Sequence, residues 1–224
     1  MKKLVLTAFI LLFQFIHAQE ITSNLGDFTS VRVFDRISVQ LVASSENKIV
    51  IKGEKANDVE IVLRNKELKI RMKFSKLLKG EDINATLYYN GMIDKIEASE
   101  GSYVSSQDNF KNTSFDLNAK EGATIKLSLD VEKLKSKINS GGEIELSGKA
   151  TNHSISITSG GILKARNFIT SQTSITVSAG GNADVNATEF VEARVRAGGT
   201  VDIFGNPKKI DKKTVAGGTI NERA

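Results

Sequence analysis

Apolar and polar residues alternate over most of the second half of the chain. Stretches such as Ser154-Ile155-Ser156-Ile157-Thr158 and Ser174-Ile175-Thr176-Val177-Ser178 place a β-branched residue at every second position. Successive side chains of a β-strand point to opposite faces, so a period of two predicts strands with one buried face.

Pairs centred on glycine interrupt these stretches at nearly constant intervals. Counted from the second residue of each pair, the steps are 21, 20, 19, 20, 18 and 19 residues. The pairs are Glu100-Gly101, Glu121-Gly122, Gly141-Gly142, Gly160-Gly161, Gly180-Gly181, Gly198-Gly199 and Gly217-Gly218. A repeat of this length is typical of a solenoid. The sequence therefore predicts an all-β fold, a right-handed parallel β-helix (β-solenoid) with coils of about 19–20 residues.

The glycine pairs also set the register within each coil. Apolar residues lie two and four positions after the second glycine and four positions before it, and we expect both sets to face the interior. They are Ile144, Leu146, Leu163, Ala165, Ala183, Val185, Val201 and Ile203 in the first set, and Ile138, Ile157, Val177 and Val195 in the second. An outward column contains Glu145, Lys164, Asp184 and Asp202. Asp184 and Asp202 would lie about 5 Å apart, and like charges that close raise one pKa.

Glycine suits a corner between strands because it accepts positive φ and lets neighbouring backbones approach without a Cβ. The alternative is a calcium-binding nonapeptide repeat, which contains a third glycine followed by Asp. Gly180-Gly181-Asn182-Ala183-Asp184 lacks that third glycine and places its Asp one residue early. We therefore expect structural corners and no metal.

The N-terminus divides the chain further. Residues 1–18 resemble a secretory signal, with Lys2 and Lys3 before an apolar run and Ala18 before the expected cleavage site. That run is short for a membrane span, and no second hydrophobic stretch follows it. Residues 19–95 form an expected N-terminal β region, with strands near residues 30–34, 37–42, 48–52, 60–63, 68–74 and 85–89, and residues 96–224 form the glycine-cornered coils. The β region either caps the coils or adds wider coils to them.

Composition limits the chemistry. The chain has no Cys and two His, and removal of the signal leaves only His153, which we expect in an ordinary loop. The mature chain therefore lacks the residues needed for a thiolate metal site and for a multi-histidine site, and it has a single His for Ser-His-Asp catalysis. We expect no cofactor. The mature net charge of about +3 makes nucleic acid an improbable partner for an exported protein.

Two groups of residues are candidates for binding. Lys69, Arg71 and Lys73 alternate with apolar residues, which places three charges on the open face of one strand. They would suit an anionic glycan or membrane surface, or they form a solvated face. Tyr88, Tyr89 and Tyr103 are the aromatic candidates for sugar stacking near the junction of the two regions, since the chain has no Trp. The alternative is that these tyrosines belong to the core.

Three features of the chain occur together in one order: the opening residues 31–39 (VRVFDRISV), the repeated Ser-Gly-Gly and Ala-Gly-Gly coils, and the close at residues 201–207 (VDIFGNP) and 216–220 (AGGTI). In these features the chain resembles the head GIN domain family of auto-transporter adhesins. This resemblance implies a β-helical fold and the envelope of a Gram-negative bacterium, either periplasm or cell surface, and it carries no catalytic residues.

Two functions remain open. The first is an exported, non-catalytic envelope or surface module of adhesin type that binds glycan or an envelope protein. The alternative is a β-helical enzyme that acts on polysaccharide through surface carboxylates, with Asp184 and Asp202 as the expected pair.

Overall fold

The computed structural model describes residues 20–223, so the signal peptide expected over residues 1–18 lies outside the described part. About 69% of the structure is strand and 3% is helix. Five long strands form its body: β9 (Tyr103–Lys120), β10 (Thr124–Asn139), β11 (Glu143–Thr158), β12 (Ile162–Ser178) and β13 (Asn182–Arg196). β14 (Thr200–Phe204) and β15 (Lys209–Val215) form the next coil on β13, and β16 (Thr219–Glu222) stacks on β14 as the start of a further coil.

Eight shorter strands precede the body. They are β1 (Glu20–Asn24), β2 (Ser30–Val33), β3 (Ser38–Ala43), β4 (Lys48–Lys52), β5 (Val59–Arg64), β6 (Glu67–Met72), β7 (Asn84–Tyr89) and β8 (Lys95–Ala98), with short 3-10 turns at Ala56–Asp58 and Phe74–Lys76. The sequence anticipates six of these strands to within two residues at either end, and it misses β1 and β8. In the described residues no helix is both long and apolar enough to cross a membrane.

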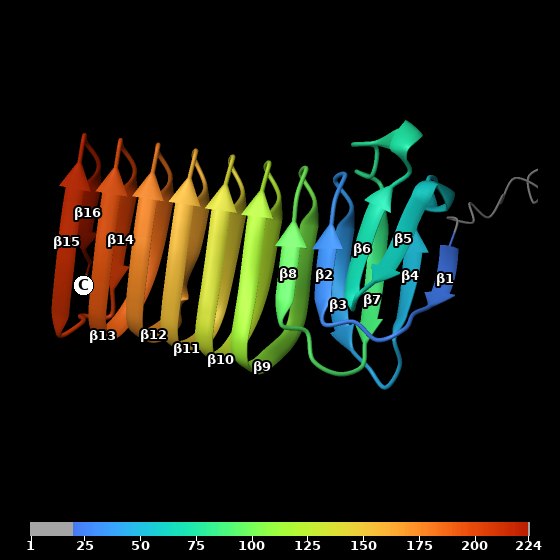
Figure 1. The fold of residues 1–224 in the computed structure, drawn as a ribbon, viewed down its shortest axis with the longest axis horizontal. Coiled ribbons are helices and arrows are strands. Elements are labelled where there is room, and N and C mark those ends of the chain that lie inside the picture. The colour runs from blue at the N-terminus through green and yellow to red at the C-terminus, as the bar shows by residue number, and fades with distance from the viewer. Residues whose placement is uncertain (1–19, 224) are drawn as a thin grey trace, which may run out of the picture.

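The strands wind into a β-solenoid of about 7 turns spaced by about 19 residues, which confirms the predicted fold class. Each long strand runs from one glycine corner, around a wide bend, and back to the next corner (Figure 1). Coils pair in parallel so that like residues stack, and one interior column reads Ile125, Ile144, Leu163, Ala183, Val201 and Ile220. The residues predicted to face the interior are all buried.

At each corner, the two roles expected of a glycine pair fall to different positions. The first position adopts positive φ, and the second allows close packing between coils. The residue before the first glycine and the first glycine itself both have positive φ, as at Ser140 (49°) and Gly141 (72°). The second glycine packs against the preceding coil, because a Cβ on Gly142 would overlap the Ala119 carbonyl. Gly101 and Gly122 occupy the first position, so the true intervals from Gly101 are 21, 19, 19, 20, 18 and 19 residues.

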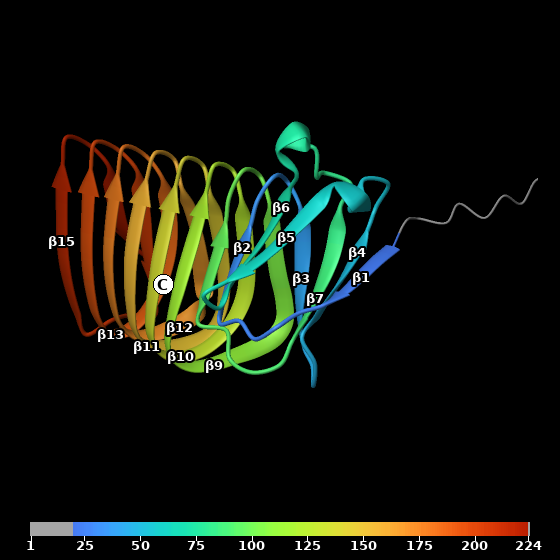
Figure 2. The ribbon, with the colours of Figure 1, turned by 45° about the vertical axis from the view of Figure 1, so that its right-hand side comes forward.

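The N-terminal region contains both of the arrangements left open by the sequence. β2 and β3 form a parallel coil whose neighbours are β6 and β7 on one side and β8 and β9 on the other. Residues 30–43 therefore lie between two coils that come later in the chain (Figure 2). β1, β4 and β5 pair antiparallel with their neighbours and cover the outermost coil.

Candidate functional site

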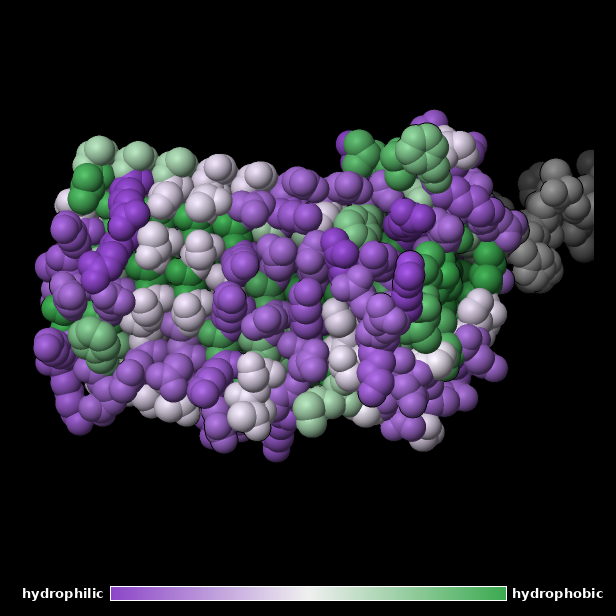
Figure 3. Space-filling view, in the orientation of Figure 1, coloured by the Kyte–Doolittle hydropathy of each residue, from purple (hydrophilic) through white to green (hydrophobic). Residues whose placement is uncertain are grey.

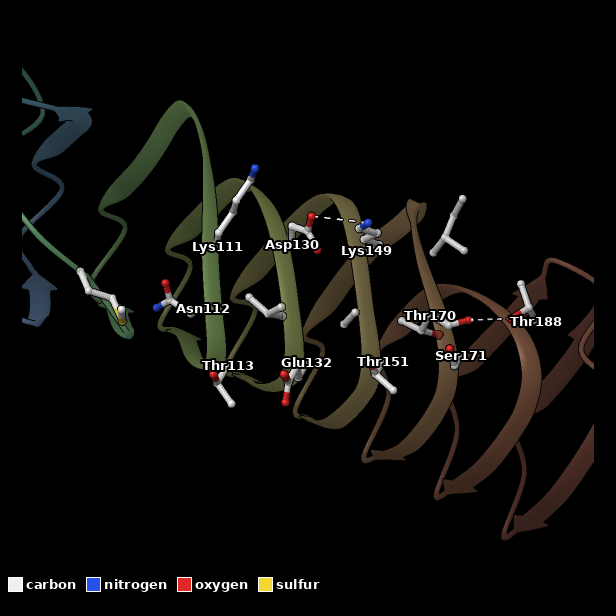
Figure 4. Close-up of a pocket in the computed structure, with 14 residues that line it drawn as sticks. Lys111, Asn112, Thr113, Asp130, Glu132, Lys149, Thr151, Thr170, Ser171 and Thr188 are labelled. Atoms are coloured by element: carbon white, nitrogen blue, oxygen red, sulfur yellow. Dashed lines mark hydrogen bonds and ion pairs between the residues drawn. The ribbon is translucent and has the colours of Figure 1, made fainter.

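A trough runs along the bend edge of the solenoid, across consecutive coils and parallel to the stacking axis. Its volume is about 690 Å³. The floor is a column of paired residues, Asn112, Val131, Ala150 and Thr170. One rim carries Lys111, Asp130, Lys149 and Ile169, and the other carries Thr113, Glu132, Thr151 and Ser171 (Figure 4). The small side chain of Ala150 between longer rim residues keeps the trough open.

The floor is fixed by hydrogen bonds, whereas the rims are free to bind. The Thr170 hydroxyl donates to the Asn186 carbonyl at 2.9 Å, and the Asn112 amide donates to the Ile93 carbonyl at 2.7 Å. On the rim, Lys149 Nζ lies 3.5 Å from the Asp130 carboxylate. Lys111 and Glu132 form no ion pair with any described residue and are exposed. The trough therefore presents a rigid floor and a mixture of hydrogen-bond donors and acceptors.

The trough lining combines two carboxylates, Asp130 and Glu132, with the ammonium groups of Lys111 and Lys149 and with several hydroxyls. All of these groups can form hydrogen bonds with a bound ligand. Across residues 20–223, no three His, Cys, Asp or Glu side chains gather in a way that could hold a metal ion.

A second groove, of about 560 Å³, follows the charged column predicted from sequence. Glu145, Lys164, Asp184 and Asp202 pair in register along four coils, as expected, and Lys126 extends this column by one more coil. Lys126 Nζ lies 2.8 Å from Glu145. Lys164 turns away from Asp184 and contacts Glu143 at 2.6 Å.

The two aspartates of this column differ in their surroundings. Burial and the nearby charge of Asp202 raise the pKa of Asp184 above its usual range, as the predicted stacking of like charges requires. Burial acts in the same direction on Asp202, but hydrogen bonds from Asn221 (2.7 Å) and Arg223 (3.0 Å) lower its pKa overall. Arg166 beside Asp184 and Arg223 beside both aspartates therefore balance the charges of the pair.

The three tyrosines do not form a common platform. Tyr89 lies in the core, the second of the two alternatives that the sequence left open: its ring stacks on Phe110 with centroids 5.6 Å apart. Tyr88 is half-buried beneath Lys48, whose Nζ lies 4.9 Å from the ring centroid. Tyr103 is 39% exposed. Tyr88 pairs with Val42 and Tyr103 with Ser38, so about 13 Å of strand separates them.

The basic residues lie elsewhere and have local partners. Lys69 contacts Glu67 at 3.3 Å, Arg71 contacts Glu60 at 2.8 Å, and Lys73 Nζ donates to the Asn57 carbonyl at 2.6 Å. They belong to β6 and the residue after it, whereas the tyrosines belong to β7 and β9. The structure therefore does not bring the basic and aromatic candidates into one groove.

The trough is a site that the glycine register does not predict, and the expected position of His153 in a loop is wrong. His153 lies in the interior, 3% exposed, and not in a loop. The trough has a signal in the sequence, because Lys111, Asp130 and Lys149 recur at intervals of 19 residues with alternating charge. This signal lies in the middle of each repeat, away from the glycine pairs that set the register.

Comparison with known proteins places this geometry in a family. The family described as "Putative auto-transporter adhesin, head GIN domain" matches residues 27–207. The chain belongs to this head GIN domain family. No protein of curated function is detectably similar to it in sequence.

Solved structures share the fold of this head GIN domain at low sequence identity. A putative adhesin from Bacteroides fragilis aligns with a TM-score of 0.83 and 18% identity, over 93% of this chain and 98% of that one. A putative adhesin from Parabacteroides distasonis gives 0.71 and 18%, over 92% and 96%. A protein from the same species, described as a putative lipid binding protein, gives 0.69 and 15%, over 94% and 98%. At these identities the likeness shows the fold alone.

Proposed function

We propose that this head GIN domain protein is an exported, non-catalytic binding module that holds an extended glycan chain along the bend trough. The observation that carries the proposal is the repetition of equivalent polar positions, Lys111, Asp130 and Lys149, along the solenoid axis. The adhesin-like family supports a binding role. Its export is supported by the N-terminal signal expected from sequence.

The trough suits a hydroxyl-rich polymer for physical reasons. Neighbouring coils are about 4.8 Å apart, a spacing comparable to the length of one sugar unit, so successive units of an extended glycan would each lie over one coil. Ammonium and carboxylate groups alternate along Lys111, Asp130 and Lys149 of one rim, whereas hydroxyls and the Glu132 carboxylate line the other rim. An acyl chain would leave those groups unpaired, so the trough itself does not suit the lipid suggested by one structural neighbour.

Binding of the purified protein to an array of bacterial and host polysaccharides tests the proposal. Lys111→Ala combined with Lys149→Ala should weaken binding about tenfold or more, as should Ala150→Phe, which fills the floor. Lys137→Ala, at an exposed lysine outside the trough, is the matched control and should bind as the native protein does. Binding that is unaffected by both trough variants would overturn the proposal.

The enzyme alternative rests on one observation, the raised pKa of Asp184 beside the lowered pKa of Asp202. Such a pair divides naturally into an acid and a base for glycoside hydrolysis. Release of reducing sugar from array-positive polysaccharides distinguishes the two functions. We expect none; a release abolished by Asp184→Asn with folding retained would establish the enzyme instead.

The compartment can be tested on intact cells. Protease shaving followed by mass spectrometry should release peptides of residues 96–224 if the coils are displayed outside. A periplasmic marker protein controls for lysis. Peptides that appear only after the outer membrane is opened would make the module periplasmic and its glycan a component of the envelope.

A further inference from the structure

An enlarged corner projects from the outermost parallel coil. β2 and β3 turn at Asp35 and Arg36, but the equivalent turn between β6 and β7 takes residues 73–83. Residues 73–79, here called the tip loop, extend beyond the line of glycine corners (Figures 1 and 2). Every other corner of the described stack turns within a few residues, so closing the coil does not require this extension.

The tip loop displays apolar side chains that the core would readily bury. Phe74 is 89% exposed, Leu77 45% and Leu78 44%. Apolar colour covers the end of the projection in the space-filling view (Figure 3). A grouping of three large exposed apolar residues on a protrusion marks an interaction site more often than an ordinary surface.

Lysines surround these apolar residues. Lys73, Lys76 and Lys79 alternate with them, and no acidic residue lies between Lys73 and Gly80. Lys55 reaches the loop from the other side, with its Nζ 3.5 Å from the Lys79 carbonyl. The nearest acidic neighbours along the chain are Glu81, whose carboxylate lies 3.8 Å from Arg36, and Asp82. Glu100 and Glu121 lie below the loop, on the corner edge.

The buried carboxylate of Asp35 holds the loop in its projecting conformation. It accepts hydrogen bonds from the Met72 and Leu78 amides at 2.9 Å each, and the Gly80 amide donates to the Asp35 carbonyl at 3.1 Å. Leu78 has φ of 59°, a conformation that costs energy for a residue with a side chain. A Cβ on Gly80 would overlap the Asp35 carbonyl. The fold therefore tolerates strain to keep Leu77 and Leu78 outward.

We propose that the tip loop docks the solenoid onto an anionic phospholipid surface. Phe74, Leu77 and Leu78 would enter the boundary between headgroups and acyl chains, while the lysines contact anionic headgroups. The charge pattern favours this occupant. So does the size of the loop, since seven residues bury less surface than a stable protein partner requires. This inference is independent of the glycan trough, which lies at the opposite edge of the coils.

Co-sedimentation of the purified protein with vesicles tests the proposal. Vesicles of phosphatidylcholine mixed with phosphatidylglycerol should bind the protein, and vesicles of phosphatidylcholine alone should bind it about tenfold more weakly or worse. Phe74→Ser with Leu77→Ser should abolish most of the binding, and Lys76→Glu with Lys79→Glu should remove its dependence on phosphatidylglycerol. Val215→Ser, at a 49% exposed apolar residue of the far coil, is the matched control and should bind normally.

Phe74, Leu77, Lys79 and Val215 are exposed and Lys76 is half-buried, so the variants should fold, and thermal melts followed by circular dichroism verify that they do. Equal binding to both kinds of vesicle, or binding indifferent to the loop variants, would overturn the proposal. Self-association in analytical ultracentrifugation that disappears with Phe74→Ser would instead assign the loop to contact between two copies of the chain, and this too would overturn it.

Discussion

The hydroxyl oxygen of Ser136 lies 2.9 Å from Nε2 of His153 inside the solenoid, on two neighbouring coils. The imidazole also meets the edge of Phe168, with ring centroids 5.5 Å apart. Burial lowers the pKa of His153 from 6.5 to about 3. The ring is therefore neutral in the folded protein and belongs to the packing of the core.

This pair predicts how stability depends on pH. The unfolded chain binds a proton at His153 below about pH 6.5 and the folded protein does not, so the contribution of this residue is complete above that pH and is lost as the pH falls toward about 3. Each pH unit in this window costs about 1.4 kcal/mol. Urea unfolding of Ser136→Ala/His153→Leu should show a shallower decline than the native protein between about pH 6.5 and 4.5. If the unfolding free energies of the variant and the native protein fell equally steeply over this pH range, the prediction would be contradicted.

A second prediction concerns the ion pair that joins the inserted coil to its neighbour. The Arg32 guanidinium lies 2.8 Å from the Glu97 carboxylate. Burial acts to raise the pKa of Glu97, but the charges of Arg32 and Lys120 outweigh it and hold this pKa below its usual range. Arg32→Met should destabilise the fold by about 3 kcal/mol, because it leaves a buried carboxylate with Lys120 alone. Adding Glu97→Gln should recover most of that loss, as measured by chemical unfolding. A double variant as unstable as the single one would refute the coupling.

A third prediction separates the two uses of glycine. Gly141 and Gly148 both have positive φ, 72° and 100°, but only at Gly148 would a Cβ overlap the backbone of the adjacent coil, at Leu129. Gly141→Ala should cost about 1–2 kcal/mol for its backbone conformation alone. Gly148→Ala should cost at least about 2 kcal/mol more, because coils must separate to admit the methyl group. Similar melting temperatures for the two variants would count against this explanation.

A fourth prediction follows from the charged column. Since burial and Asp202 raise the pKa of Asp184, the carboxylate of Asp184 is less favourable in the folded protein than in the unfolded chain at neutral pH. Asp184→Asn should therefore raise the urea midpoint slightly at pH 7. At a pH well below the usual pKa of Asp, the same variant should have an unchanged or reduced midpoint. In Asp202→Asn, carboxyl NMR should show the pKa of Asp184 moving down. A midpoint that falls at pH 7 would argue for a structural role of the Asp184 charge.

The sequence predicts the coils well because the periodicity that it shows is the periodicity that packs them. Ile138, Ile157, Val177 and Val195 are buried for the same reason that they are recognisable, a fixed distance from a glycine corner. Strand positions in the N-terminal region are also predictable from alternation. Their partners are not, because alternation gives the face of a strand and not its neighbour, so the placement of β2 and β3 between later coils had no signal.

The candidate site was less predictable than the fold. Residue type alone favoured Tyr89 as a sugar platform, yet its place in the period-two pattern of β7 puts it beside Phe110 in the core. The trough depends on a bend in the middle of each strand, and nothing as distinctive as a glycine pair marks that bend. The tip loop was not predictable as a unit. The alternating pattern extends the expected strand of residues 68–74 into the loop at Lys73, and no pattern marks Leu77 and Leu78.

The position of residues 30–43 in the stack sets the order in which the protein can assemble. From Tyr103 onward, each coil pairs with the one that precedes it in the chain, so this part can grow by local steps. The coil of β2 and β3 must instead wait for two later segments, one on each side. Closing such long loops is slow, so residues 30–43 should be among the last to reach their final place although they lie near the start of the chain.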